Sequence, residues 1–411
     1  MAGRADPFRI VAAGALALGA VAGGALTART ARRMAAPRAP RPTPVRSVDL
    51  ERGTIVLGAT AGALLPGRYS FWFAEGRGHA RVGAVLGRHG DAVVRELLGV
   101  DTGDLAAAVE GRFNGWMHLT PDAFGVPYRS ERVQTTQGAV PAWIVPAGDG
   151  TRWAVLVHGR SSVRQEALRA IPVFTAAGFT VLLPAYRGDG EAPVADDGSR
   201  YSVVDSEWVD VESAILHALD GGAKEVVLAG WSSGASIVLT TAHRSRVRSV
   251  ITGVMLDSPV LDGTRSLLAR GEGVPAPVRH GALSLLTSRV GGLLGRDALN
   301  VDPAVLADPA DVDVPVLVLQ SEDDGVAPPE VAHAFAAARP DLVHLVPFVG
   351  ARHTRLWNLD TDRWEGALTA WLERDAVALA ALTGEAAASG RRAGPSRRGA
   401  ARRASPEAPA T

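Results

Sequence analysis

Residues 228–236, with the sequence LAGWSSGAS, decide the fold of this chain. They hold Ser232 between Gly230 and Gly234, a G-x-S-x-G spacing that arises easily by chance in a chain with 46 glycines. The flanking sequence is more informative. EVVLAG, an apolar run of strand length, precedes Ser232, and ASIVLTTAHR, which can form a helix, follows it. We therefore expect Ser232 at a strand-to-helix turn.

A turn of this kind favours a nucleophilic serine. It is too tight for Cβ atoms near the serine, so it needs small residues where Gly230 and Gly234 stand. The serine also lies at a helix N-terminus, whose free N–H groups and positive dipole end stabilise a developing negative charge. A serine at this position can instead simply cap the helix. The strand and helix around Ser232 favour the nucleophile.

A nucleophilic serine needs a base, and the base needs an orienting carboxylate. When the serine lies at a strand-to-helix turn, the acid follows a later strand and the histidine comes after the last one. The strand-like run at 315–320 leads directly to Asp324, with Asp323 as its rival and Glu322 as a weaker alternative. Of the ten histidines, His353 follows the acid in a loop directly beyond a strand. These residues are the candidate acid and base.

Two backbone N–H groups are candidates for an oxyanion hole. The strand-like run 154–157 ends in His158 and Gly159, so the N–H of Arg160 is expected to face the serine from the neighbouring strand end. The N–H of Ser233, directly after the candidate nucleophile, is the expected second donor. An ordinary turn at the end of a strand is the alternative for this histidine-glycine pair.

Strand-like and helix-like segments alternate from Tyr128 onward. This alternation predicts an α/β fold with a mostly parallel, doubly wound sheet and helices on both faces over residues 128–375. The expected strands are AVPAWIV (139–145), RWAVLVHG (152–159), TVLLPAYR (180–187), EVVLAG (225–230), VITGVMLD (250–257), PVLVLQS (315–321) and LVHLVPF (342–348). The expected helices include 164–178, 206–221 and 329–340.

Four segments together resemble the signature segments of α/β-hydrolase fold serine hydrolases. They are VLVHG, AGWSSGAS, VLVLQSEDDGVAP and GARHTRLWN, and the resemblance covers about residues 128–374. It implies that Ser232 attacks an acyl carbon, that His353 takes and returns the proton, and that Asp324 holds His353. It also implies that water releases the acyl group.

The expected activity is cleavage of an ester in a small molecule through an acyl-enzyme on Ser232. An aminopeptidase or oligopeptidase-like activity on a peptide is the first alternative. Such a peptidase would need carboxylates that hold a substrate amine, for which Asp257, Asp262 and Asp189 are candidates. The second alternative is a non-catalytic binding module that keeps the hydrolase fold, and an incomplete triad would have supported it.

The N-terminal residues 1–33 indicate contact with a membrane. Residues 10–28 carry no charge and are flanked by arginines, and as a helix they would span about 28 Å, close to the thickness of a bilayer core. We expect a single-pass membrane anchor, with a signal that is cleaved from a secreted protein as the alternative. The proline-rich residues 34–45 are then expected to be an extended linker.

Three further regions lie outside the resemblance. Residues 46–127 are expected to form a β-rich extension with one helix over 104–113, and aromatic residues gathered there are expected in its core. Residues 263–314 interrupt the strand alternation and are expected to be a cap, in which 278–295 form either a lid helix or part of the core on the sheet. Residues 376–411 are rich in arginine and expected to be disordered.

Composition excludes several classes of site. The chain has 43 basic and 43 acidic residues, so no overall field favours nucleic acid. It has no cysteine, which excludes disulfides, thiolate metal sites and a cysteine nucleophile. No His, Asp and Glu cluster has metal-ligand spacing, and no phosphate-binding glycine loop follows the first strand of the expected sheet. We therefore expect neither a metal nor a cofactor.

Overall fold

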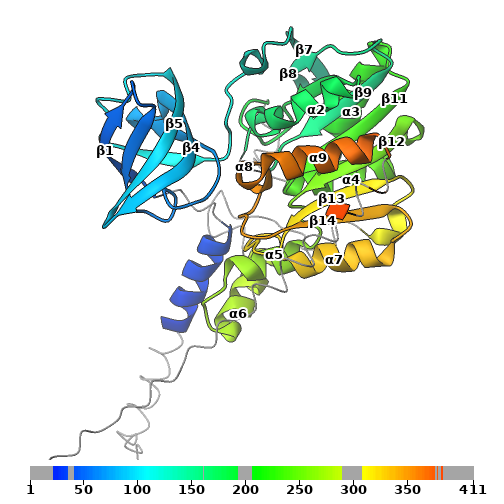
Figure 1. The fold of residues 1–411 in the computed structure, drawn as a ribbon. Helices are drawn as coiled ribbons and strands as arrows, with labels where there is room; N and C mark the ends of the chain where they lie inside the picture. The colour runs from blue at the N-terminus through cyan, green and yellow to red at the C-terminus, as the bar shows by residue number, and fades with distance from the viewer. Residues whose placement is uncertain are drawn as a thin grey trace, which may run out of the picture.

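The computed structural model describes residues 22–35, 41–160, 162–192, 206–288 and 308–374, together with residues 377, 381 and 382. The described residues form a closed β-barrel near the N-terminus and an eight-stranded sheet covered by helices (Figure 1). A connection that contains the short 3-10 helix η2 (Pro121–Phe124) joins the two. The α/β fold with a β-rich N-terminal extension is confirmed.

The sheet has the strand order β14-β13-β12-β11-β9-β10-β8-β7. Strands β9 to β14 are parallel, whereas β8 pairs antiparallel with both β10 and β7 at one edge. The strands are β7 (Arg129–Thr135), β8 (Gly138–Val145), β9 (Arg152–Val157), β10 (Thr180–Pro184), β11 (Glu225–Trp231), β12 (Ile251–Asp257), β13 (Val316–Ser321) and β14 (Val343–Phe348). Seven of these follow the expected runs, and β7 was not expected because its sequence, RSERVQT, is largely polar.

Helices cover both faces of the sheet because its strands are apolar on both sides. On one face α3 (Trp208–Asp220), α4 (Ser233–Arg244) and α7 (Pro329–Ala338) complete one hydrophobic cluster. On the other face α2 (Ile171–Ala176) and α9 (Thr361–Leu372) complete a second cluster. Neighbouring residues of β9 belong to different clusters, Val155 to the first and Leu156 to the second. This division is expected for a buried strand, whose side chains alternate between two faces.

The barrel closes in the order β1-β2-β5-β4-β3-β6. Its strands are β1 (Thr43–Asp49), β2 (Thr54–Gly58), β3 (Tyr69–Phe73), β4 (Gly78–His89), β5 (Ala92–Thr102) and β6 (Glu110–Asn114). Tyr69, Phe71, Phe73 and Phe113 are buried in its core. Strand β1 starts at Thr43, so the barrel begins inside the stretch expected to be a linker.

The helix expected over residues 104–113 is absent from this described stretch. The side chain of Asp104 accepts the N–H of Ala106 at 3.0 Å, a local turn that competes with a helix. Residues from Glu110 onward then pair as β6 with both β1 and β3. The alanine-rich sequence favours a helix locally, but closure of the barrel requires a strand there.

Arg95 lies inside the barrel with no exposed surface. Its guanidinium donates to the carbonyls of Ala63 at 3.1 Å and Leu65 at 2.7 Å, and also to those of Gly67 and Gly83. Burial lowers the pKa of Arg95 to about 10. Carbonyl dipoles therefore compensate this charge, and they fix the connection between β2 and β3 to β4 and β5.

A helix of residues 22–35 packs against the described part of the expected cap, as Figure 1 shows beside α6. Ala31 and Met34 are buried against Leu267 of α5 (Gly263–Arg270) and against Ala282 and Leu286 of α6 (Ala276–Thr287). This cluster is separate from the two clusters on the sheet. The described part of 278–295 therefore packs on other cap residues and on the N-terminal helix, not on the sheet.

No helix among the described residues is long and apolar enough to cross a membrane. Residues 1–21, which hold most of the expected anchor or signal, lie outside the described residues, so that expectation stays a prediction. Residues 36–40 of the expected linker, 289–307 of the expected cap and nearly all of the expected disordered tail also lie outside them.

Arg95→Leu is expected to lower the free energy of unfolding of the barrel by about 3 kcal/mol, because buried carbonyls lose their donors. Urea unfolding followed by tryptophan fluorescence measures this change. Arg88→Leu on β4 is the control, because Arg88 is exposed and its loss should change the free energy by less than about 0.5 kcal/mol. Equal effects of the two substitutions would refute the structural role of Arg95.

Candidate active site

Ser232 lies at the turn between β11 and α4, as expected. Its backbone has φ 55° and ψ −118°, a left-handed conformation that non-glycine residues rarely adopt. A Cβ at Gly230 would overlap the carbonyl of Gly234, and a Cβ at Gly234 would overlap the carbonyl of Val157. Ser232 makes no capping hydrogen bond to α4 with its side chain, so the alternative that it simply caps the helix is wrong.

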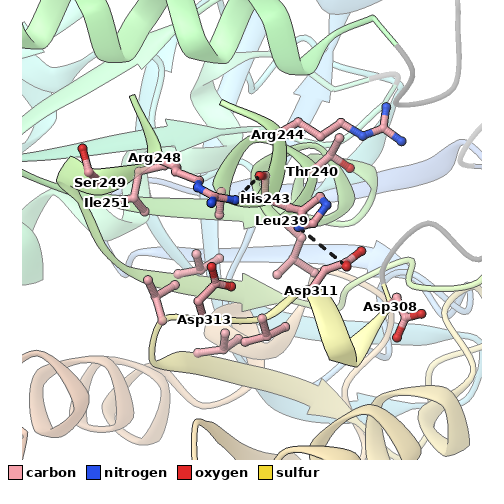
Figure 2. A pocket seen from close by; sticks show the side chains of 15 residues that line it. Leu239, Thr240, His243, Arg244, Arg248, Ser249, Ile251, Asp308, Asp311 and Asp313 are labelled. Carbon is pink, nitrogen blue, oxygen red and sulfur yellow. Dashed lines mark hydrogen bonds and ion pairs between the residues drawn. The ribbon is translucent and has the colours of Figure 1, made fainter. Parts of the chain in front are cut away.

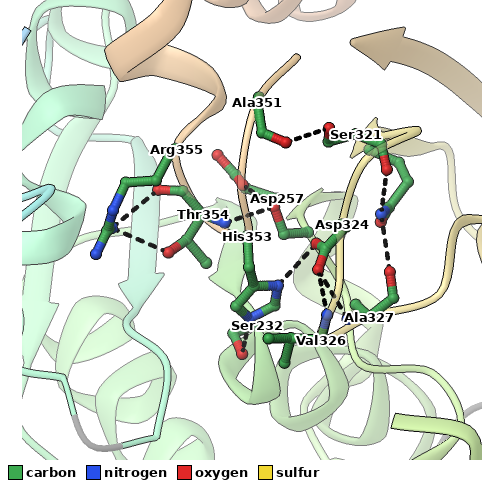
Figure 3. Close-up of polar contacts among 12 residues, drawn as sticks. Ser232, Asp257, Ser321, Asp324, Val326, Ala327, Ala351, His353, Thr354 and Arg355 are labelled. Carbon is green, nitrogen blue, oxygen red and sulfur yellow. Dashed lines mark hydrogen bonds and ion pairs between the residues drawn. The ribbon is translucent and has the colours of Figure 1, made fainter. Parts of the chain in front are cut away.

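The structure brings Ser232, His353 and Asp324 together in one hydrogen-bonded chain, shown in Figure 3. Nε2 of His353 lies 2.8 Å from Oγ of Ser232, and Nδ1 of His353 lies 2.7 Å from Oδ2 of Asp324. Because an ionised carboxylate only accepts, Nδ1 carries the hydrogen and the lone pair of Nε2 faces the serine hydroxyl. This arrangement is the one that a general base requires.

The backbone fixes Asp324, whose side chain is fully buried. Its second oxygen, Oδ1, accepts N–H groups from Val326 at 2.8 Å and from Ala327 at 2.9 Å. The two alternative acids point elsewhere. Asp323 accepts the N–H of Gly350 at 2.6 Å, and Glu322 lies 2.7 Å from His333.

Both expected oxyanion residues lie beside Ser232, but the N–H of Arg160 already has a partner. It donates to Oγ of Ser233 at 2.7 Å. The preceding N–H, that of Gly159, donates to Oε2 of Glu166 at 3.0 Å. A Cβ at Gly159 would lie 3.0 Å from Cβ of Ser232, so this loop packs directly on the candidate nucleophile.

His158 packs beneath the sheet end that carries Gly159 and Arg160 and helps to hold that loop. It is fully buried, and its ring stacks on that of Tyr186 with the centroids 4.5 Å apart. Its Nε2 lies 3.3 Å from Oδ2 of Asp189, and the hydroxyl of Tyr186 donates to the carbonyl of His158 at 2.9 Å. The histidine therefore holds the end of β9 in place.

A buried network that sequence reasoning missed supports the loop of His353. Thr354 donates its N–H to Oγ of Ser258 at 3.0 Å, and the Ser258 hydroxyl donates to Asp257 at 2.8 Å. The indole of Trp364 donates to the other oxygen of Asp257 at 2.8 Å. The sequence predicts for Asp257 only a role in holding a substrate amine. The signal available in the sequence was its place at the end of a strand.

Glu166 lies among buried cations. Burial raises the pKa of its carboxyl, but the guanidiniums of Arg169 and Arg355, together with the N–H of Gly159 and the hydroxyl of Ser162, outweigh burial, so the net pKa is lowered. Burial raises the pKa of Asp257, against a smaller opposing effect of Arg169. Glu166 therefore places a negative charge beside Arg169 and Arg355, close to the loop of Gly159.

His118, in the connection after the barrel, lies close to the domain of the eight-stranded sheet. The ring of His118 lies 4.6 Å from Phe124 and 6.3 Å from Trp357, measured between centroids. Burial, helped by the charge of Arg81, lowers the pKa of His118 to about 4. Burial also lowers the pKa of His79, whose Nδ1 lies 2.7 Å from Asp101.

A cavity of about 550 Å³ lies away from this site, at the far end of α4 (Figure 2). Leu239, His243, Arg248 and Asp311 are among the residues that line it. Ser232 precedes the first residue of α4, whose 12 residues span about 18 Å. The cavity is therefore unconnected with the chemistry of Ser232. Within the described ranges, no group of three or more His, Asp or Glu residues could hold a metal ion.

Comparisons with known families cover both parts of the chain. Residues 154–370 match the model of a family described as the alpha/beta hydrolase family. Residues 44–114, which include nearly all of the barrel, match a model described as a domain of unknown function. No curated protein matches the chain.

Solved structures similar to this chain include two esterases and a peptidase. An esterase from Pyrococcus furiosus is 16% identical over 62% of this chain and 94% of its own, with a TM-score of 0.49. A thermophilic esterase from Thermogutta terrifontis is 20% identical over 60% of this chain and 98% of its own, with a TM-score of 0.42. A puromycin-hydrolyzing peptidase from Mycobacterium tuberculosis is 20% identical over 81% of this chain and 46% of its own, with a TM-score of 0.46.

His118 is expected to destabilise the folded protein in mild acid. Its lowered pKa means that the unfolded chain binds a proton below about pH 6.5 while the folded chain does not bind one until about pH 4. Stability is therefore lost as the pH falls through this window, by about 2 kcal/mol at pH 5 relative to pH 7.5.

Urea unfolding of wild type and His118→Leu at these two pH values measures this contribution. The substitution should remove about 2 kcal/mol of the acid sensitivity. His89→Leu, at an exposed histidine on β4, is the matched control and should leave the acid sensitivity unchanged. The same pH dependence in wild type and His118→Leu would contradict the expectation.

Proposed function

The chain belongs to the alpha/beta hydrolase family, and on that premise we propose that it is a serine hydrolase that cleaves an ester through an acyl-enzyme on Ser232. The observation that carries the proposal is the continuous hydrogen-bonded chain from Ser232 through His353 to Asp324. A serine hydroxyl is a weak nucleophile, and a base at 2.8 Å with a buried carboxylate behind it is the arrangement that activates it.

In the proposed reaction His353 removes the proton of Ser232 through Nε2 while Oγ attacks the acyl carbon. Asp324 keeps the ring oriented and stabilises the imidazolium that forms. The imidazolium then gives its proton to the leaving alcohol oxygen as the ester bond breaks, which leaves the acyl group on Ser232. Water, deprotonated by the same histidine, attacks the acyl-enzyme and releases the acid.

The proposed oxyanion donors are the backbone N–H groups of Arg160 and Ser233. The N–H of Arg160 meets the Ser233 hydroxyl at 2.7 Å, so a substrate oxygen has to displace that hydroxyl to reach this donor. Ser233 is the first residue of α4, and the N–H of Arg160 contacts its hydroxyl, so the helix dipole adds to the stabilisation of an oxyanion there. Each such donor typically lowers the barrier by about 3 kcal/mol.

An ester is favoured over an aminopeptidase substrate because the three candidate carboxylates are already engaged. Asp257 is fully buried and bonded to Trp364 and Ser258. The side chain of Asp189 is fully buried beside His158. Asp262 accepts the backbone N–H of Arg265 with Oδ1, which caps α5, and pairs with the Arg265 guanidinium through Oδ2 at 3.5 Å. None of the three carries an oxygen that is both exposed and uncommitted, as recognition of a free amine requires.

The alternative of a non-catalytic binding module is disfavoured by the same geometry. A fold kept only as an interaction surface has no need of a left-handed serine aligned with a histidine and a buried acid. Such a backbone conformation costs about 1–3 kcal/mol and is typical of functional sites.

Ser232→Ala is expected to abolish labelling by a fluorophosphonate probe. Ser232→Ala and His353→Ala are each expected to lower the rate of hydrolysis of an activated ester by four or more decades. The nucleophile and its base act as a unit, so loss of either removes nearly all of the activation. Labelling and ester hydrolysis by purified full-length variants measure this, with circular dichroism to verify folding. A folded wild type that takes no label, or a Ser232→Ala variant that is still labelled, would overturn the proposal.

Asp324→Asn should lower ester hydrolysis by about three to four decades, because an amide can present its N–H to His353 and favour the wrong tautomer. Asp323→Asn is the matched control, since its partner is the N–H of Gly350 and not His353. It should change the rate by less than about threefold. If Asp323→Asn proves the more damaging substitution, the acid is assigned to the wrong residue.

A further inference from the structure

We propose that the N-terminal barrel holds the loop of His353 in its working position, with Asn358 as the positioning residue that joins the two. This inference rests on the proposed function, because it assigns the barrel a role toward the base of that reaction. The loop of His353 runs into the short helix α8 (Leu356–Leu359), which lies between the barrel and the sheet in Figure 1.

Asn358 is the point of contact and is almost fully buried. Its side-chain N–H₂ donates to the carbonyl of Arg68 at 2.8 Å and to that of Gly115 at 3.0 Å. Its backbone carbonyl accepts the N–H of Arg68 at 2.9 Å. The residue is therefore bonded to two segments, one at the start of β3 and one directly after β6.

The other side of Asn358 faces the hydrolase core. Nη1 of Arg169 approaches its Oδ1 at 3.4 Å and donates to the carbonyl of Thr354 at 3.1 Å. Thr354 directly follows His353 in the chain. One buried guanidinium thus connects the contact with the barrel to the loop of the proposed base.

Arg355 makes a second connection to the same peptide group. Its guanidinium donates to the carbonyl of Thr354 at 3.2 Å and to the Thr354 hydroxyl at 3.1 Å. The backbone of Gly115 covers this guanidinium so closely that a Cβ at Gly115 would overlap it. Packing of Gly115 on the Arg355 guanidinium therefore keeps this guanidinium bonded to Thr354.

Thr354 needs this support because of its own backbone. Its φ is 52°, in the left-handed region that β-branched residues avoid. Such a conformation persists only when the surroundings fix it on several sides. Ser258 holds the N–H of Thr354, and the two arginines hold its carbonyl. Loss of the contact between the barrel and Asn358 weakens the hold of the two arginines on the Thr354 carbonyl. The loop can then relax and move Nε2 of His353 away from Ser232.

A substitution at Gly67 can loosen this contact without changing any residue of the hydrolase domain. It has φ 93°, and a Cβ there would overlap the carbonyl oxygen of Asn358. Gly76, also in the barrel, has φ 89° and no atom within 4 Å of where its Cβ would lie. Alanine at either position meets the same backbone strain, but only alanine at Gly67 pushes against α8.

The test compares labelling of full-length Gly67→Ala and Gly76→Ala by a fluorophosphonate probe, with the maximal labelling rate separated from the half-saturating probe concentration. Gly67→Ala should lower the maximal rate by about 30- to 100-fold, since a displacement near 1 Å of a reacting group has effects of this size. Gly76→Ala should stay within about twofold of wild type. The half-saturating concentration should change little in either variant, because the base moves and not the probe-binding surface.

Asn358→Asp is the second variant, and it remains informative if Gly67→Ala does not fold. The aspartate keeps an acceptor for Arg169 but loses both donors to the barrel. It should lower the maximal labelling rate by at least about tenfold while the far-ultraviolet circular dichroism stays that of wild type. Asn358→Asp labelled at the wild-type rate overturns the proposal.

The outcomes separate this inference from the proposed function. A wild type that takes no label, or whose label is independent of Ser232, refutes the hydrolase. Labelling at Ser232 that is equally fast in Gly67→Ala and Gly76→Ala leaves the hydrolase standing and refutes the role of the barrel. A fall in both the maximal rate and probe binding, equal in the two glycine variants, also refutes it.

Discussion

The left-handed backbone at Ser232 is the constraint on which the rest of the site depends. Its N–H donates to the carbonyl of Asp257 at 2.9 Å, and its carbonyl accepts the N–H of Val260 at 3.2 Å. The end of β12 therefore holds the conformation. Ser258, between these two partners, has φ 51° itself and donates its N–H to Leu319 of β13 at 2.9 Å. The strained backbone of the candidate nucleophile is thus held beside Ser258, which is also strained, and β13 in turn holds Ser258.

This dependence explains why Asp257 serves the structure and not the proposed chemistry. Strand β12 lies directly beside β11, so its end is closer in the sheet to Ser232 than the end of β13, which leads to Asp324. Asp257 nevertheless points both oxygens at Ser258 and Trp364 and is fully buried. A carboxyl that accepts the Ser258 hydroxyl with one oxygen and the Trp364 indole with the other is not free to hold a histidine as well. The proposed acid, Asp324, follows the next strand, where the N–H groups of Val326 and Ala327 orient it.

The elements that depend on local sequence could be predicted, and those that depend on contacts across the chain could not. The turn at Ser232 follows from two glycines between an apolar strand and a helix, and the candidate acid and base follow from chain order. Residues 104–113 show the limit, because alanine-rich propensity predicts a helix where barrel closure demands a strand. Asn358 shows the same limit at the site. Its partners Arg68 and Gly115 are 290 and 243 residues away, and no local pattern indicates such contacts.

Barrel segments also contact the buried charges behind the loop of His353. Arg169 and Arg355 both approach the carbonyl of Thr354, and burial lowers the pKa of each guanidinium. The charges of Glu166 and Asp257 both oppose this lowering, and carbonyl and amide dipoles add to the compensation of the two cations. The barrel contributes to this by packing Gly115 on Arg355 and by orienting Asn358, whose oxygen faces Arg169. Without these segments water would reach the two guanidiniums and compete with the Thr354 carbonyl for their hydrogen bonds. The contact of the barrel with Arg355 and Asn358 therefore both excludes water and fixes the loop of His353.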